Sequence, residues 1–141
     1  YIPPLNIIQI PESCSVELKK ALFDSFNLYW IDLGSCANKI RIAVEILLDN
    51  LNIPRSNSKG NSKLSLHSRI DLLRYNTPDI SDSLLAIKWI GNAGSHEEID
   101  REGVLDAYEI FEFTLDKIFP DRENKITGIR NEINNSRSPR K

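Results

Sequence analysis

The segment LGSCANKIRIAVEILLDNL, from Leu33 to Leu51, carries the strongest periodic pattern in the chain. Its apolar residues recur at steps of three and four, at Leu33, Ala37, Ile40, Val44, Leu47 and Leu51. Because an α-helix has about 3.6 residues per turn, this spacing places them on one face. The segment therefore predicts a long helix whose apolar side packs against other helices.

The same periodicity predicts helices on both sides of this segment. The first begins at a serine cap, Ser13 or Ser15, and the fourth begins with Thr77 as its cap and Pro78 at its first position. By number, the expected helices lie within residues 13–34, 33–51, 64–76, 77–92 and 101–119. No segment has the alternation of a strand. We therefore predict an all-α bundle of four to five helices, with one long loop at residues 52–63.

Three regions differ in composition. Prolines forbid a regular helix in residues 1–12, so we expect an extended, proline-rich N-terminal arm. Residues 13–119 carry the helical periodicity and form the predicted bundle domain. Residues 120–141 are polar and basic, with six basic and three acidic residues from residue 121 onward, and are expected to form a flexible C-terminal tail.

Charge and hydropathy limit the partners that this chain can have. With 18 basic and 20 acidic residues, its formal net charge is -2, so any site for a polyanion must be local. No apolar run could span a bilayer and no signal peptide is visible, so we expect a cytoplasmic protein without a membrane partner. The chain contains no methionine, which suggests a piece of a longer or processed polypeptide.

The residues that bind metals or act as nucleophiles lack a recognisable frame. Cys14 and Cys36 are expected to be buried thiols, with a disulfide or a metal site as the alternative. His67 is expected on a helix surface near the amino end of its helix. The acidic run HEEID after Ser95 starts with His96, but adjacent residues on a helix point in different directions. We predict no metal and no cofactor.

Arg41 and Glu45 lie four residues apart between apolar neighbours of the long helix. At this spacing a guanidinium and a carboxylate can meet along the helix surface. The pair predicts either an intrahelical ion pair or a brace to another helix. A role in binding an anion or a partner is the alternative.

The stretch KWIGNAGSH, from Lys88 to His96, is open to two interpretations. In the first, the glycines end the helix: Gly91 lets two helices approach closely, and Asn92 and His96 bind backbone groups at a turn. Trp89 would then lie in the core or at a dimer contact. In the second, the helix continues and Lys88, Asn92 and His96 share one face. A phosphate-binding loop is excluded because no strand precedes the glycines and no G-K-[ST] follows.

Three motifs occur in order: RIAVE from Arg41, then LSLHSRIDLL, then IKWIGNAGSH, which contains the pattern G-N-x-x-x-H. Together with PPLNIIQIP near the start, they resemble a bacterial family, the domain of unknown function 4145, over about residues 1–119. Such domains resemble the wider HEPN superfamily of helical bundles, which implies an HEPN-like fold and an association with defence or nuclease proteins.

The HEPN ribonucleases use an arginine, a polar residue and a histidine, usually across a two-fold dimer interface. Here Asn92 matches the polar residue and His96 the histidine, but the arginine position falls on Gly91. Lys88 could replace it as a point charge only. RNA cleavage needs a group that moves the proton and a fixed cation that stabilises the transition state. The resemblance therefore implies binding or structural roles for Arg41, Glu45, Gly91, Asn92 and His96.

Three functions remain open. The first is a non-catalytic interaction and dimerisation module, a homodimer that serves other domains or subunits of a larger bacterial protein in defence or nucleic-acid metabolism. The second is a metal-independent endoribonuclease, a toxin with a degenerate site made of His96, Asn92 and Lys88. The third is RNA or DNA binding through a basic tail. The basic residues of that tail are Arg130, Arg137, Arg140 and Lys141.

Overall fold

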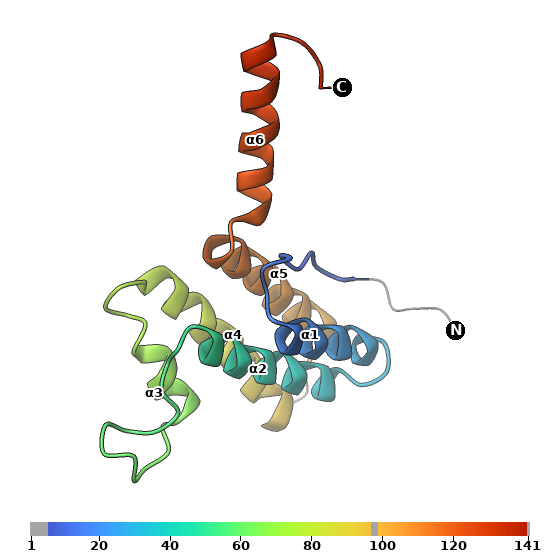
Figure 1. The fold of residues 1–141 in the computed structure, drawn as a ribbon. Helices are drawn as coiled ribbons and strands as arrows, with labels where there is room; N and C mark the ends of the chain where they lie inside the picture. Colours follow the sequence, from blue (N-terminus) through green and yellow to red (C-terminus); the bar gives the residue numbers. More distant parts are fainter. Residues whose placement is uncertain (1–5, 97–98, 141) are drawn as a thin grey trace.

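The computed structural model of this chain describes residues 6–96 and 99–140 and is all-helical within them. Its six helices are α1 (Val16–Tyr29), α2 (Leu33–Asn50), α3 (Leu66–Asp71), α4 (Pro78–His96), α5 (Arg101–Ile118) and α6 (Asp121–Ser136) (Figure 1). In these residues there is no strand, and the only bridge joins Ser56 to Lys63 in the long loop. The all-α prediction is confirmed, with one helix more than the four to five expected.

Helix α2 lies at the centre of the bundle, between α1 and α4, and α5 closes the core from the other side (Figure 1). The predicted apolar stripe of α2 is buried, and only its two end residues are partly exposed. Large side chains from α1 and α5, among them Phe26, Tyr108 and Phe111, fill the space against it. Burial of this stripe is the main force that holds the bundle together.

Side-chain caps set the starts of the helices. The Ser15 hydroxyl accepts the Leu18 N–H, so Ser15 and not Ser13 caps α1, and Asp32, Ser65 and Asp100 cap α2, α3 and α5 in the same way. Each such cap contributes about 1 kcal/mol. Pro78 is the first residue of α4, as its sequence predicts. Helix α3 is shorter than expected, because residues 72–76 form turns.

The N-terminal segment packs on α5. Residues 1–5 of the predicted arm lie outside the described residues. In residues 6–12, the Ile8 side chain is buried in the core and the Gln9 N–H donates to Glu112. Ser13 then binds the Asp121 carboxylate through both its N–H and its hydroxyl, at 2.9 and 2.7 Å. These contacts attach the segment to α5 and to the first residue of α6.

Most of the residues expected to form a flexible tail are helical. Helix α6 projects away from the bundle, and none of its residues is buried (Figure 1). Its polar composition suggested a tail, but Asp121 and Glu123 in its first turn favour a helix because carboxylates interact well with the amino end of the helix dipole. The bond between Ser13 and Asp121 fixes that end.

Two further predictions concern the cysteines and the membrane. Cys14 and Cys36 are free, buried thiols, as expected. Burial raises the pKa of the Cys14 thiol to about 11, so it stays protonated and is a poor nucleophile. Among the helices that the structure describes, none has the length and hydropathy needed to cross a membrane.

Candidate functional site

Helix α4 continues through both glycines and ends at His96. The interpretation in which the glycines end the helix is therefore wrong, whereas the close helix approach expected at Gly91 is present. Glycine lowers helix stability by about 1 kcal/mol relative to alanine, which favoured a break. Packing of α4 against α2 offsets this cost, because the Gly91 backbone is buried in their contact. Positions 88, 92 and 96 consequently follow one another at single turns of the same helix.

Gly91 lies at a close contact of α4 with α2. A Cβ atom built on Gly91 would lie 3.3 Å from the Arg41 Cβ and 3.5 Å from the Ala37 carbonyl oxygen. Both neighbours belong to the backbone or to the base of a side chain of α2, so they cannot move freely. Position 91, which the resemblance to HEPN ribonucleases aligns with their arginine, thus faces the interface of α2 and α4.

Arg41 is partly covered by α4 and is not paired with Glu45. The Arg41 Nε is buried without a hydrogen-bond partner in the described structure. No ion pair within 4.0 Å joins Arg41 to Glu45, although the structure describes both side chains. The expected intrahelical ion pair is therefore wrong. Arg41 lies against Gly91, whereas Glu45 lines a small hollow beside Arg69 and Arg55.

Lys88 and Trp89 lie together on the outer part of α4. The Lys88 ammonium lies over the Trp89 ring, 3.8 Å from its centroid. The centroid of the His67 ring, on the exposed surface of α3, lies 6.1 Å from the centroid of the Trp89 ring. Trp89 is 54% exposed, so its predicted place in the core is wrong, while a dimer contact remains a prediction. His67 lies on the helix surface, as expected. Asn92 is partly buried.

The side chain of His96, the histidine of the proposed ribonuclease site, lies outside the described part of the structure. Of residues 93–96 only the helical backbone is described, and Glu97 and Glu98 lie outside the described residues. In the part of the chain that is described, no group of three or more His, Cys, Asp or Glu residues is arranged to hold a metal ion. The candidate site therefore consists of Arg41 and Gly91 at the contact of α2 and α4, together with Lys88 and Asn92 one turn apart on α4.

A charged cluster that no sequence pattern predicted lies near the carboxyl end of α2. The buried Arg69 side chain donates to Asp49, at 2.7 Å, and to the carbonyl oxygens of Ile53 and Pro54, at 3.0 and 3.2 Å. Arg55 also donates to Asp49 from the surface. This cluster ties the start of the long loop to α2 and α3. No local spacing signals it, because its members are up to 20 residues apart.

A second missed group is a polar network inside the core. The Tyr108 hydroxyl donates to Ser25 at 2.7 Å and lies 3.2 Å from the Cys36 sulfur. The network joins α1, α2 and α5. Burial raises the pKa values of Tyr108 and Cys36, so both stay protonated near neutral pH. It is a structural network, because no member is accessible to a substrate.

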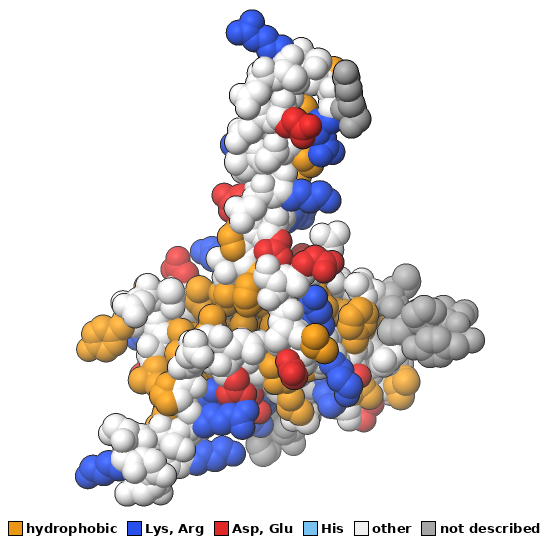
Figure 2. All heavy atoms as spheres, viewed as in Figure 1, with side chains coloured by type: hydrophobic (Ala, Val, Ile, Leu, Met, Phe, Trp, Pro, Cys, Tyr) orange, Lys and Arg blue, Asp and Glu red, His pale blue; other side chains and the backbone are white. Residues whose placement is uncertain are grey.

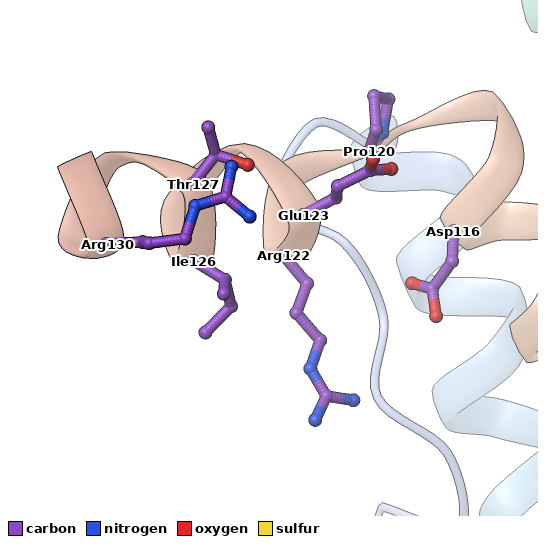
Figure 3. A pocket seen from close by; sticks show the side chains of 7 residues that line it. All are labelled: Asp116, Pro120, Arg122, Glu123, Ile126, Thr127 and Arg130. Atoms are coloured by element: carbon purple, nitrogen blue, oxygen red, sulfur yellow. The ribbon is translucent and has the colours of Figure 1, made fainter.

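The basic residues of the predicted tail are spread out. Arg130 belongs to α6, and Arg137 ends this helix with a left-handed φ of 55°. Lys141 lies outside the described residues. Near the base of α6, Arg130 and Arg122 line an open hollow that also holds Asp116 and Glu123, and Figure 3 shows the two arginines extending in different directions from the helix. Because both signs of charge are present, this surface offers no purely basic patch.

Comparison with known proteins places these features in a family. A family model described as "Domain of unknown function (DUF4145)" matches residues 24–135. The match includes the α2–α4 contact and extends into α6, beyond residue 119, where the sequence analysis ended the domain. Among curated proteins and solved structures, none matches this chain. The chain therefore belongs to the DUF4145 family of domains of unknown function.

Proposed function

We propose that this domain is a non-catalytic, HEPN-like interaction module that forms a homodimer and serves a larger bacterial defence- or nucleic-acid-associated protein in the cytoplasm. One observation carries the proposal. The position that would hold the catalytic arginine is a glycine packed against Arg41, with 3.3 Å between a built Cβ and the Arg41 Cβ. The arginine is absent, and a side chain at this position would point into the interface of α2 and α4.

The neighbouring cation does not replace it. The Lys88 ammonium lies over the ring of its own neighbour Trp89, so a cation–π contact already engages this charge. Lysine also lacks the planar fork that grips a phosphate with two hydrogen bonds. Loss of one fixed transition-state donor costs about two to three orders of magnitude in rate. These features favour a binding role over RNA cleavage.

The test combines an activity assay with a measurement of mass. We expect the purified chain to leave single-stranded and structured RNA intact, with and without a chelator, and to sediment as a dimer at micromolar concentration. An RNA digest by a known metal-independent ribonuclease controls the assay. Cleavage that disappears in His96→Ala would contradict the non-catalytic role, and a strict monomer at high concentration would contradict the dimer.

The unpaired Arg41 supports a second candidate function, binding of a phosphodiester. A buried donor without a partner costs about 1–3 kcal/mol, and an anion that accepts from the Arg41 Nε would remove this cost through a charge-assisted hydrogen bond. In this alternative Arg41 of α2, which packs against Gly91, supplies the cation that position 91 lacks. The domain would then bind RNA, or cleave it with His96 as the group that moves the proton.

Arg41→Met separates this alternative from a purely structural role. The substitution keeps an unbranched chain against Gly91 and removes the unpaired Nε, so we expect the free energy of unfolding to rise by about 1 kcal/mol. If Arg41 binds phosphodiesters, affinity for a short RNA at low salt falls about tenfold or more in the same variant. Urea denaturation and fluorescence anisotropy measure the two effects.

The control variant is Arg74→Met, which removes an exposed guanidinium that is already paired with Asp71 and Asp82. It should leave RNA binding unchanged. If Arg41→Met and Arg74→Met lower the affinity equally, Arg41 has no special role and the second candidate fails.

A further inference from the structure

Helix α6 carries an apolar stripe that residues 6–96 and 99–140 leave largely exposed. Ile126, Ile129 and Ile133 follow at steps of three and four, so they lie on one face. Ile126 is 53% and Ile133 38% exposed, and α6 touches the bundle mainly at its first turn. A 16-residue helix with no buried residue is marginal in water. Contact of this stripe with a partner would therefore stabilise the helix.

The stripe continues into a groove at the base of the helix. Ile10 and Pro11 of the N-terminal segment form one side of this groove, which has a volume of about 460 Å³, and Ile126 and Ile129 form the other. Figure 2 shows hydrophobic side chains gathered below α6, and acidic and basic side chains along the helix itself. The apolar surface is thus long enough to receive a second helix beside α6.

The charges that flank the stripe determine which helix fits. Lys125 and Glu132 lie seven residues apart on one side of the stripe, and Glu123 and Arg130 lie seven apart on the other. Each side thus carries one acidic and one basic residue. Residues beside an apolar helix seam form the ion pairs that set partner choice and orientation. A partner helix must therefore carry the reverse order of charge on each side.

An antiparallel second copy of α6 meets this requirement. When Ile126 faces the partner's Ile129, the antiparallel direction also brings Lys125 beside the partner's Glu132 and Glu123 beside the partner's Arg130. The two-fold axis repeats each contact, so four pairs of opposite charge flank the isoleucines. A parallel copy would instead bring Lys125 beside the partner's Arg130, and these charges repel.

We propose that α6 forms an antiparallel, two-fold helix pair with α6 of a second copy of this chain. The inference rests on the proposed homodimer and names its interface. The projection of α6 away from the bundle leaves room for the partner's bundle beyond the far end of the helix (Figure 1). The aliphatic stem of Arg122 then lies opposite the partner's Ile133 and covers it.

The first test substitutes the centre of the stripe. In Ile126→Asp and in Ile129→Asp, sedimentation equilibrium should show a dimer dissociation constant raised by about 30-fold or more, the effect of losing a central interface residue. Asn131→Asp is the matched control, because it adds the same charge on the side of α6 opposite the stripe and should leave the constant unchanged. Circular dichroism checks that the bundle, to which α6 contributes no buried residue, stays folded.

The second test exchanges charges and reports the orientation. Lys125→Glu alone and Glu132→Lys alone should each weaken the dimer about threefold to tenfold. In each variant, residues 125 and 132 carry the same charge and repel each other at both symmetry-related contacts. The double variant Lys125→Glu/Glu132→Lys should recover wild-type affinity. An equimolar mixture of the two single variants should also recover it, because each chain then meets its opposite charges on the other.

The outcomes separate this inference from the proposed function. If the wild-type chain is a dimer that Ile126→Asp and Ile129→Asp do not weaken, the α6 interface is wrong while the homodimer stands. If the wild-type chain is a monomer, both fail. If Lys125→Glu strengthens the dimer, the helices are parallel and the antiparallel arrangement is overturned. Cleavage of RNA by a dimer that these variants do weaken would overturn only the non-catalytic role.

Discussion

Gly91→Arg is expected to lower the free energy of unfolding by about 3 kcal/mol or more, although arginine is a far better helix residue than glycine. The new Cβ would lie 3.3 Å from the Arg41 Cβ and 3.5 Å from the Ala37 carbonyl oxygen, and neither atom can move without shifting α2. The substitution also brings a second guanidinium beside Arg41, so repulsion and desolvation add to the steric cost. Urea denaturation followed by circular dichroism measures the loss.

Gly128→Arg is the matched control for this substitution. It places the same side chain on α6, where a Cβ would have no other atom within 4 Å. Helix propensity alone should then raise stability, by up to about 1 kcal/mol. Gly91→Ala should lower the free energy of unfolding by less than Gly91→Arg, because its single methyl group requires a smaller shift of α2. Equal stability of Gly91→Arg and the wild-type chain would show that position 91 is not closely packed, and it would remove the main support for a non-catalytic domain.

The helical core could be predicted because its signals are local. The apolar steps of α2, the caps and Pro78 at the start of α4 are each visible within a few residues of sequence, and they lie where expected. Helix α6 was missed because its apolar stripe has only three isoleucines among polar residues, a pattern that a solvated tail also shows. The first turn of α6 depends on Ser13, more than a hundred residues earlier.

The candidate site was less predictable because its contacts join different helices. The four-residue spacing of Arg41 and Glu45 predicts a pair, but the spacing rule takes no account of α4, which covers Arg41 at Gly91. Gly91 also suggested a helix end, because glycine has a low helix propensity. Burial of Gly91 against α2 nevertheless keeps it helical. Local rules therefore proposed the residues of the candidate site, but they predicted the Arg41–Glu45 ion pair and the helix end at the glycines wrongly.

Arg69→Ala is expected to lower the free energy of unfolding by about 2–3 kcal/mol, because it removes the donor for Asp49 and for the carbonyl oxygens of Ile53 and Pro54. Breaking a fully buried ion pair costs about 3–5 kcal/mol, and the partial exposure of Asp49 reduces this value. Arg55→Ala is the control: it removes an exposed partner of the same carboxylate and should cost much less. Equal losses in the two variants would contradict a special role for the buried guanidinium.

The pH dependence of this loss distinguishes the ion pair from simple packing. The hydrogen bond from Arg55 lowers the pKa of Asp49 more than burial raises it, and Arg69 lowers it further, so the folded value lies below the ordinary 3.8. A carboxyl with a depressed folded pKa stabilises the fold above its unfolded pKa, and this contribution is lost as the pH falls through the folded pKa. The difference in stability between wild type and Arg69→Ala should therefore be constant near neutral pH and shrink below about pH 4. A difference that does not change down to pH 3 would mean that the aliphatic stem of Arg69, rather than its bond to Asp49, stabilises the loop.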